Sequence, residues 1–329
     1  MSQGILIVGC GSIGERHLRC FQGTGRVEVA ACDANAALLD RVAGRHGVTG
    51  FRDFDAALAA RRFDGIVICT PAHTHVGIAT AALRHGASAL IEKPLGTSLE
   101  GIGALREAAA TGRFVAVAYI YHLMPWIQGA REVLRGGELG RPLHASVAAG
   151  QHFPTYRPAY RDIYYARHES GGGAIQDALT HVANAVEWLL GPTTRVFCDA
   201  AHRALEGVTV EDTVNVVARN GDTLVNYALN QFQAPNEMTL QIHCERGSVR
   251  VEGHGQRWGV FRRGADAWEH HGADPVERDD LFVAQANAFL DGAAGRPTPL
   301  ATLDEAIQTL KFNLAALESA RTGLAVEIA

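Results

Sequence analysis

Continuous apolar runs alternate with helical patterns along the first third of the chain. The run Ile5-Leu6-Ile7-Val8 contains no polar position, which is expected of a strand buried on both faces of a parallel sheet. The expected strands are residues 5–8, 27–32, 65–69, 88–91 and 113–120, and the helices between them include 15–21, 98–110 and one that ends near Arg84. This alternation predicts an α/β domain with about six parallel strands.

The pattern changes near Tyr121, so we place the boundary between a domain of residues 1–122 and a second of residues 123–329. A helix over 126–135 follows, and from Arg195 onward apolar and polar residues alternate with a period of two. Short turns such as Asn220-Gly221-Asp222 predict antiparallel hairpins in one large open sheet. The expected strands are 195–201, 213–218, 223–231, 238–244, 248–251 and 258–262. Helices over 280–293 and 303–321 end the chain and are free to pack back on the first domain.

Length and charge agree with this division and exclude several functions. The chain has 329 residues, whereas single cores rarely grow beyond ~250–300 residues. A net charge of −5 gives no basic surface for nucleic acid or for an anionic membrane. No apolar run reaches the ~18–20 residues of a membrane span, and the amino terminus does not resemble a signal peptide. We therefore expect a cytoplasmic enzyme or binding protein.

The cysteines indicate a reducing compartment. The sequence has 6 cysteines without a Cys-x-x-Cys pair, and most of them stand in apolar surroundings. Such residues are typical of a reduced protein core. We expect no metal site from this spacing.

A glycine motif follows the first strand. Gly9-Cys10-Gly11-Ser12-Ile13-Gly14 has the spacing Gly-x-Gly-x-x-Gly and lies between a strand and a helix. In that position glycines allow a tight turn, and backbone amides such as those of Ser12 and Ile13 approach a pyrophosphate. The alternative is a plain tight turn.

The second predicted strand ends in an acid that bears on the choice of cofactor. Asp33 lies where a carboxylate can bind the adenosine ribose hydroxyls. Ala34 and Asn35 follow it, and neither offers an arginine to a 2′-phosphate. NAD is therefore favoured over NADP, and the alternative is a surface acid.

Two further strand ends carry polar residues. Thr70-Pro71 follows the run at 65–69, and Glu92-Lys93-Pro94 follows the run at 88–91. Because ligands bind beyond the carboxyl ends of parallel strands, these residues should converge with the glycine motif on one edge. Lys93 is then a candidate functional residue, although an isolated lysine is more often a solvated surface group.

A glycine run, Gly171-Gly172-Gly173, opens a helix in the second domain. The helix carries Asp177 and His181, whose spacing of four residues puts both side chains on one face. Asn184 and Trp188 continue this narrow stripe, opposite an apolar one, so the acid and the imidazole are not expected in the core. The stripe is either a solvated helix face or a site that faces a ligand, and Trp188 indicates that something covers one end of it.

A polar and aromatic segment precedes the glycine run. Such a segment suits recognition of a hydroxylated ring by hydrogen bonds and stacking, but it is equally compatible with an interface loop or an ordinary covered surface. Its members, with Tyr121 at the domain boundary, are the candidate substrate contacts Tyr121, His152, Tyr156, Arg157, Tyr160 and Tyr164.

Taken together, these motifs resemble those of the glucose-fructose oxidoreductase and inositol dehydrogenase family (Gfo/Idh/MocA) over almost the full length. The resemblance rests on Gly9-x-Gly11-x-x-Gly14, Thr70-Pro71 with His75, Glu92-Lys93-Pro94, and the glycine run with Asp177-x-x-x-His181. It implies a Rossmann domain followed by an α+β domain with a large mixed sheet. It also implies cofactor contacts at Thr70, Pro71, His75, Glu92 and Lys93.

The resemblance further implies an activity. Members transfer hydride between nicotinamide and a secondary hydroxyl or carbonyl of a sugar or cyclic polyol, and Lys93, Asp177 and His181 match their catalytic lysine, acid and histidine. Many members have a glycine two residues before the histidine and an acid three after it, whereas this chain has Leu179 and Asn184. Transfer of a particular substrate from any one member is therefore not warranted.

Chemistry supports the same assignment. Oxidation of an alcohol requires removal of the hydroxyl proton, and histidine, with an ordinary pKa near ~6.5, is a natural acceptor. Two other functions remain open: an NAD-dependent glycosidase or lyase that oxidises the ring transiently, and a non-catalytic NAD-dependent sensor. We also expect a homodimer or homotetramer, formed through the second face of the C-terminal sheet.

Overall fold

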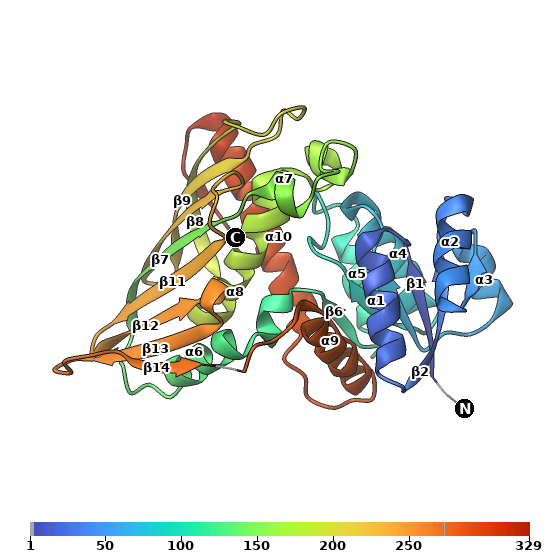
Figure 1. The fold of residues 1–329 in the computed structure, drawn as a ribbon, viewed down its shortest axis with the longest axis horizontal. Helices are drawn as coiled ribbons and strands as arrows, with labels where there is room; N and C mark the ends of the chain where they lie inside the picture. The colour runs from blue at the N-terminus through green and yellow to red at the C-terminus, as the bar shows by residue number, and fades with distance from the viewer. Residues whose placement is uncertain (1–2, 273) are drawn as a thin grey trace. The chain divides into compact units, whose positions relative to one another are not determined.

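The computed structural model describes residues 3–272 and 274–329, and the chain folds into two compact units. Unit 1 comprises Met1–Ile120 and Glu277–Leu303, and unit 2 comprises Tyr121–Val276 and Asp304–Ala329 (Figure 1). The first break lies within two residues of the expected boundary, and unit 1 also takes in one of the closing helices. The chain crosses a second time, because the first of its two closing helices packs with the N-terminal unit.

Unit 1 is built on a seven-stranded sheet with the order β15-β6-β5-β4-β1-β2-β3. Its six parallel strands are β1 (Gln3–Val8), β2 (Val27–Cys32), β3 (Thr49–Phe51), β4 (Gly65–Ile68), β5 (Ser88–Ile91) and β6 (Val115–Val117). The short strand β15 (Ala301–Thr302) adds an antiparallel edge to β6. The order of the parallel strands is that of the Rossmann fold, in which the direction of winding reverses between β1 and β4.

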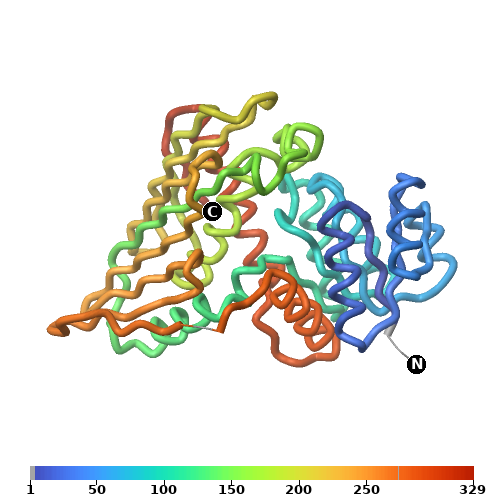
Figure 2. The backbone as a smooth tube through the Cα atoms, viewed as in Figure 1, coloured from blue at the N-terminus to red at the C-terminus, as the bar shows by residue number. Residues whose placement is uncertain are grey.

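Helices accompany this sheet, as the alternating pattern predicts. They are α1 (Ser12–Gly23), α2 (Ala36–His46), α3 (Phe54–Ala60), α4 (His75–Arg84), α5 (Ile102–Ala109) and α9 (Arg278–Ala293). The helix expected from residue 98 begins later, because Gly101 has φ +75° and cannot continue a right-handed helix. Helix α9 lies beside α1 (Figure 2). Arg19 Nε and Nη2 of α1 each donate a 2.8 Å hydrogen bond to the Asp279 carboxylate of α9.

Unit 2 is built on a nine-stranded sheet with the order β14-β13-β12-β11-β7-β10-β9-β8-β16. Its strands are β7 (Pro142–Gly150), β8 (Thr193–Ala201), β9 (Thr213–Asn220), β10 (Thr223–Asn230), β11 (Glu237–Cys244), β12 (Gly247–Glu252), β13 (Arg257–Arg262), β14 (Glu269–Gly272) and β16 (Val326–Glu327). The expected strands agree with β8 to β13 within two residues at each end.

The central strand β7 is absent from the sequence prediction. It pairs parallel with β10 and antiparallel with β11, which makes the sheet mixed. Alternate positions Ala145, Val147 and Ala149 are buried, but Ala148 lies between them on the other face. Because alanine occurs on both faces of β7, the period-two contrast is too weak to identify the strand.

Helices cover one face of this sheet. Residues of α6 (Pro125–Arg135), α8 (Thr180–Leu190) and α10 (Leu303–Thr322) form one hydrophobic core with the inward side chains of the strands (Figure 1). The opposite face carries exposed apolar side chains, among them Phe197, Val217 and Leu224. Unit 2 is therefore a two-layer structure with one open sheet face.

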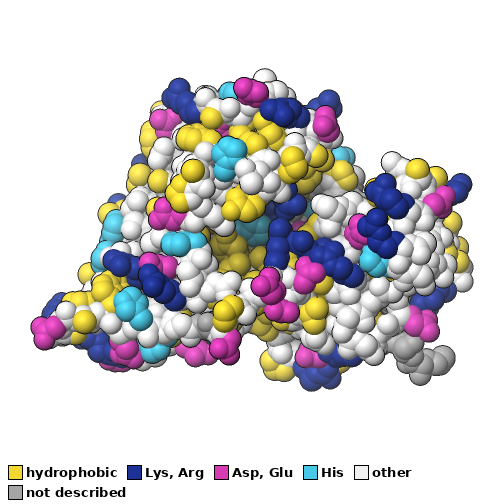
Figure 3. Space-filling view, in the orientation of Figure 1, with side chains coloured by type: hydrophobic (Ala, Val, Ile, Leu, Met, Phe, Trp, Pro, Cys, Tyr) yellow, Lys and Arg dark blue, Asp and Glu magenta, His cyan; other side chains and the backbone are white. Residues whose placement is uncertain are grey.

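Acidic and basic side chains both occur on the face of the molecule seen in Figure 3. Within residues 3–272 and 274–329, no helix is both long enough and apolar enough to traverse a bilayer. All six cysteines are buried free thiols, as expected of reduced core residues.

Candidate functional site

Four strand ends meet at one edge of the unit 1 sheet. Val8 of β1 pairs with Cys32 of β2 and with Ile68 of β4, and Ile68 pairs with Ile91 of β5. The residues that directly follow these positions are Gly9, Asp33, Cys69-Thr70-Pro71 and Glu92-Lys93. The predicted convergence of the motifs on one sheet edge is therefore confirmed.

The three motif glycines have three different roles. Gly9 has φ +94°, and a Cβ there would lie 2.7 Å from the Cys69 carbonyl group. A Cβ on Gly14 would lie 1.8 Å from the Gly9 oxygen, so this glycine allows α1 to pack closely on the turn. A Cβ on Gly11 would meet no protein atom within 4 Å. The open side of Gly11 leaves room for a ligand against the first turn of α1, where the amides of Ser12 and Ile13 favour an anion.

Asp33 fixes the other end of this turn. Its Oδ2 accepts a 2.7 Å hydrogen bond from Cys10 N, and its Oδ1 accepts one of 2.7 Å from Asn35 N. A carboxylate held beside the glycine turn, at the end of β2, fits the ribose of a dinucleotide. This carboxylate and the open space beside Gly11 together fit NAD, which has no 2′-phosphate, better than NADP.

Two of the expected cofactor residues support the loop that carries Lys93. The ring of His75 is 1% exposed, with Nδ1 2.9 Å from Pro94 O and Nε2 2.7 Å from Thr70 O. Burial lowers the pKa of His75, which favours the neutral ring. His17 Nε2 donates a 2.7 Å hydrogen bond to Glu92 Oε1, and this carboxylate is also buried. The cofactor contacts expected at His75 and Glu92 remain predictions, but the two side chains also have a structural role. Buried and committed to protein partners, they position the turns around Thr70-Pro71 and Lys93.

The glycine run opens a wide helical turn in unit 2. Residues Ile175–Leu179 form a single π-helical turn, which continues into α8. Such turns inside helices occur frequently at functional sites. Asp177 lies in the π turn and His181 in the first turn of α8. The Tyr164 hydroxyl donates a 2.6 Å hydrogen bond to Asp177 Oδ1, and the Tyr121 ring stacks on the His181 ring with centroids 5.3 Å apart.

The polar stripe of this helix is not a solvated face. Asn184 is 1% exposed and donates a 3.0 Å hydrogen bond from Nδ2 to Thr309 Oγ1 of α10. Trp188 stacks on His122, with ring centroids 4.1 Å apart, and the Arg131 guanidinium lies 4.0 Å from the centre of the Trp188 ring. Asp177 is 9% exposed. Of the two residues expected outside the core, Asp177 is therefore buried and His181 is partly buried. The covered position of Trp188 is confirmed.

Comparisons with known proteins agree with both units. Residues 3–119 match the model of the oxidoreductase family with an NAD-binding Rossmann fold, and residues 127–250 match the GFO/IDH/MocA C-terminal domain. The chain belongs to the GFO/IDH/MocA oxidoreductase family.

Relatives of this GFO/IDH/MocA oxidoreductase include named enzymes. Inositol 2-dehydrogenase of Rhizobium meliloti is 24% identical over 75% of this chain and 74% of its own. The 1,5-anhydro-D-fructose reductase of Ensifer adhaerens is 27% identical over 80% of each chain. A solved levoglucosan dehydrogenase in complex with NADH has a TM-score of 0.89 over all of both chains at 20% identity, which shows a shared fold. The cofactor of this oxidoreductase is NAD.

The six candidate substrate residues are distributed unevenly in this GFO/IDH/MocA oxidoreductase. Tyr121 and Tyr164 lie at His181 and Asp177, as described above. Tyr160 is 1% exposed and packs with Phe153 and Tyr165 in a small core, so its assignment as a substrate contact is wrong. The remaining three, His152, Tyr156 and Arg157, lie around the short helix α7 (Phe153–Tyr156) and remain predictions.

Glu211 is a site residue that the sequence analysis missed. Its buried Oε1 accepts a 2.9 Å hydrogen bond from Ile175 N, and its backbone oxygen accepts one of 2.9 Å from Ala174 N. His168 Nε2 lies 2.5 Å from Glu211 Oε2, and this hydrogen bond raises the pKa of His168. A Cβ on Gly173, whose φ is +84°, would lie 2.5 Å from Glu211 Oε1. Gly173 is therefore required because this carboxylate fills the adjacent space and holds the start of the π turn.

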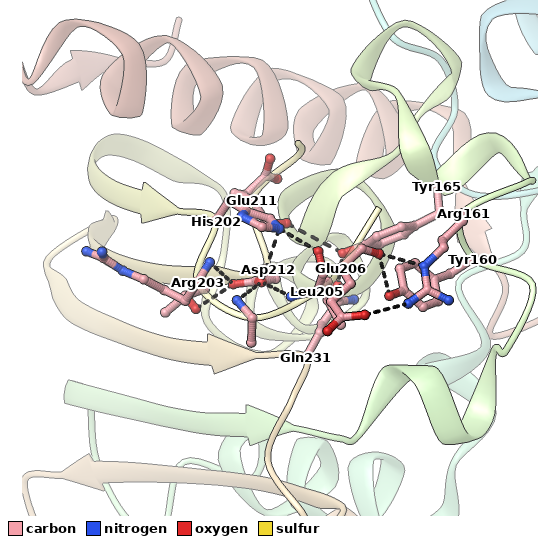
Figure 4. Close-up of polar contacts among 12 residues, drawn as sticks. Tyr160, Arg161, Tyr165, His202, Arg203, Leu205, Glu206, Glu211, Asp212 and Gln231 are labelled. Atoms are coloured by element: carbon pink, nitrogen blue, oxygen red, sulfur yellow. Dashed lines mark hydrogen bonds and ion pairs between the residues drawn. The ribbon is translucent and has the colours of Figure 1, made fainter. Parts of the chain in front are cut away.

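The neighbouring acid, Asp212, anchors a second loop. Its buried carboxylate accepts hydrogen bonds from Arg203 N, Ala204 N and Leu205 N at 2.7–2.9 Å (Figure 4). Burial acts to raise the pKa of Asp212, but these backbone donors outweigh it and hold the pKa below its ordinary value. The sequence does not reveal these roles of Glu211 and Asp212. The partner of Glu211 at Ile175 is distant in sequence, and the partners of Asp212 lie in an irregular loop.

Proposed function

We propose that this chain is an NAD-dependent dehydrogenase or reductase that acts on a secondary hydroxyl or carbonyl of a sugar, a sugar derivative or a cyclic polyol. The observation that carries the proposal is the presence of two features in one chain, one in each unit. One is the glycine turn whose Gly11 side is open at the sheet edge that also presents Lys93. The other is the π turn that presents Asp177 with a tyrosine hydroxyl bound to it. The names of the two curated relatives support the substrate class.

Each residue has a defined role in this proposal. The glycine turn and Asp33 would hold NAD, which would supply the hydride-transfer chemistry in either direction. His181 takes the hydroxyl proton during oxidation and returns it during reduction. Lys93 donates a hydrogen bond to the reacting oxygen and stabilises the negative charge that develops there. Asp177, which accepts from Tyr164, orients His181 or a neighbouring substrate hydroxyl.

The histidine is stacked on a tyrosine that stays protonated. Burial raises the pKa of Tyr121 to about 12, so its hydroxyl remains a hydrogen-bond donor at neutral pH. The flat contact between the two rings restricts rotation of the imidazole. A restricted imidazole keeps one orientation toward the substrate, which favours proton transfer.

A substrate screen tests the proposal. Cyclic polyols, aldoses and glycosides are incubated with the protein and NAD or NADP, and NADH or NADPH absorbance is followed. We expect NADH formation with at least one polyol or sugar, and a rate with NADP at least about tenfold lower because Asp33 repels a 2′-phosphate. Release of free sugar without net NADH would instead identify a glycosidase or lyase. Absence of any reaction would favour a sensor.

We infer that the open face of the unit 2 sheet binds a second copy of the chain, giving a homodimer or homotetramer. Phe197 of β8 and Val217 of β9 are paired in register and are 44% and 56% exposed. Leu224 of β10 adds a third exposed apolar side chain to the same sheet. Exposed apolar patches of this kind mark association surfaces.

Sedimentation velocity tests the oligomer. The wild-type protein is expected to sediment as a dimer or tetramer, and Val217→Lys is expected to shift it toward a smaller species by placing charge in the interface. Leu324→Lys is a matched control, because Leu324 is 67% exposed and lies outside the sheet strands. A monomeric wild-type protein at micromolar concentration would contradict the inference.

We also infer a reducing compartment, the cytoplasm, from the six buried free thiols. Thiol titration of protein purified without reductant is expected to give six free cysteines after denaturation. Disulfides in freshly isolated protein would contradict this location.

A further inference from the structure

A cavity of about 680 Å³ opens in unit 2 beside the candidate acid. Residues of two segments, 161–170 and 207–209, line it. Tyr164 is part of the lining, and its hydroxyl is the donor to Asp177 Oδ1 at 2.6 Å. The volume lies within the ~300–1,000 Å³ of typical small-molecule sites. Tyr164 therefore connects the wall of this cavity to Asp177.

The first arginine of the cavity, Arg161, is held in place by the protein. Its Nε donates a 2.7 Å hydrogen bond to Glu206 O, and its guanidinium lies 4.7 Å from the centre of the Tyr160 ring (Figure 4). Gly207 has φ +78°, and a Cβ there would lie 2.7 Å from Arg161 Cδ. The fixed side chain loses less conformational entropy when it binds an anion. The Glu206 carboxylate, 3.6 Å from Nη2, is 89% exposed and is screened by water.

Arg167 is the second arginine of the cavity lining. Across the described parts of the chain, no aspartate or glutamate forms an ion pair with its guanidinium. The Ser170 hydroxyl is hydrogen-bonded to Tyr164 O and to Arg167 O, which braces the backbone that carries both side chains. Asp162 is the one acid in the lining, so two arginines and one aspartate leave a formal charge of +1.

We propose that this cavity binds an anionic substituent of the substrate, a carboxylate or a phosphate, with Arg167 as the main ligand and Arg161 as the second. A guanidinium group matches either anion with two parallel hydrogen bonds. The inference rests on the proposed function, because it assigns the cavity to the substrate of that reaction. It narrows the substrate class from neutral sugars and polyols to sugar acids or phosphorylated sugars, including nucleotide-linked ones.

Binding to the NADH-loaded protein tests this inference without turnover, because a hydroxyl substrate cannot be oxidised when the cofactor is already reduced. Calorimetry compares matched pairs that differ in the anionic group: glucose with glucuronate, galactose with galacturonate, and glucose with glucose 6-phosphate. At least one acidic member is expected to bind about tenfold or more tightly than its neutral partner. Whether uronates or the phosphate are preferred distinguishes a carboxylate site from a phosphate site.

Two variants locate the effect. Arg167→Gln is expected to remove the preference for the acidic member while the affinity for the neutral member changes less than about twofold. Arg203→Gln is the control, because Arg203 is an exposed arginine of the neighbouring loop that does not line the cavity. It should leave both affinities unchanged. The absence of any acidic preference, or its persistence in Arg167→Gln, would overturn the inference.

The outcomes also separate this inference from the proposed function. NADH formation from sugars without an acidic preference would support the reaction and reject the anion site. An acidic preference abolished by Arg167→Gln, without NADH formation from any sugar, would support the site and reject the reaction.

Discussion

Lys93→Met and His181→Ala are each expected to lower kcat by about a thousandfold or more. The first substitution removes the hydrogen-bond donor to the reacting oxygen, and the second removes the proton acceptor. Neither residue belongs to the glycine turn, so the Kd for NADH should change by less than about threefold. Single-turnover rates and NADH fluorescence titrations measure the two quantities separately.

The chain offers a matched control for each of these two variants. Besides Lys93 the sequence contains one other lysine, Lys311 of α10, so Lys311→Met is a complete lysine control. His270→Ala changes an exposed histidine of β14. Both are expected to retain wild-type kcat. Turnover within about tenfold of wild type in Lys93→Met or His181→Ala would rule out the corresponding assignment.

The second large effect concerns the glycine turn, where Gly14→Ala and Gly11→Ala should differ. A Cβ on Gly14 would lie 1.8 Å from a backbone oxygen, so the turn must move. We expect a loss of ~2–3 kcal/mol in the free energy of unfolding and at least about a hundredfold weaker NADH binding. A Cβ on Gly11 meets no protein atom within 4 Å, so the free energy of unfolding of Gly11→Ala should change by less than ~0.5 kcal/mol. Its NADH affinity should still fall, by about tenfold or more, because the methyl group occupies the space for the pyrophosphate.

Urea unfolding and NADH titration of the same preparations measure this contrast. Gly44→Ala in α2 is the control, since a Cβ there also meets no atom within 4 Å and Gly44 is distant from the turn in sequence. Gly44→Ala should leave the NADH affinity unchanged. Its free energy of unfolding should stay the same or rise slightly, because alanine favours a helix more than glycine does. Unaltered NADH affinity in Gly11→Ala would contradict the placement of the pyrophosphate at this turn.

Much of the fold follows from local patterns. The parallel strands β1, β2, β4, β5 and β6 of unit 1 and the strands β8 to β13 are encoded by apolar stretches and by period-two alternation, which depend on neighbouring residues alone. The short strand β3 has no such pattern and was not predicted. The glycine motif and Asp33 are likewise recognisable, because their spacing along one strand and turn determines their function. Strand β7 shows where such patterns fail, because it has alanine on both faces.

The roles of single polar residues depend on long-range packing. His75 and Glu92 carry the family motif, yet their side chains are committed to Thr70, Pro94 and His17. Tyr160 is a residue type that often contacts substrates, but it packs in a hydrophobic cluster with Leu205 and Val210. In each case the partner comes from another element, so no pattern local to the residue reports it.

The sequence by itself determined the class of fold, the cofactor turn and the identity of Lys93, Asp177 and His181 as candidates, because each depends on spacing within one strand, turn or helix. The tertiary structure alone decided three other points. Glu211, 36 residues after Ile175, holds the start of the π turn; Tyr164 reaches Asp177; and α9 returns to unit 1. These depend on which distant segments pack together, and the free energy of that choice is spread over many weak contacts.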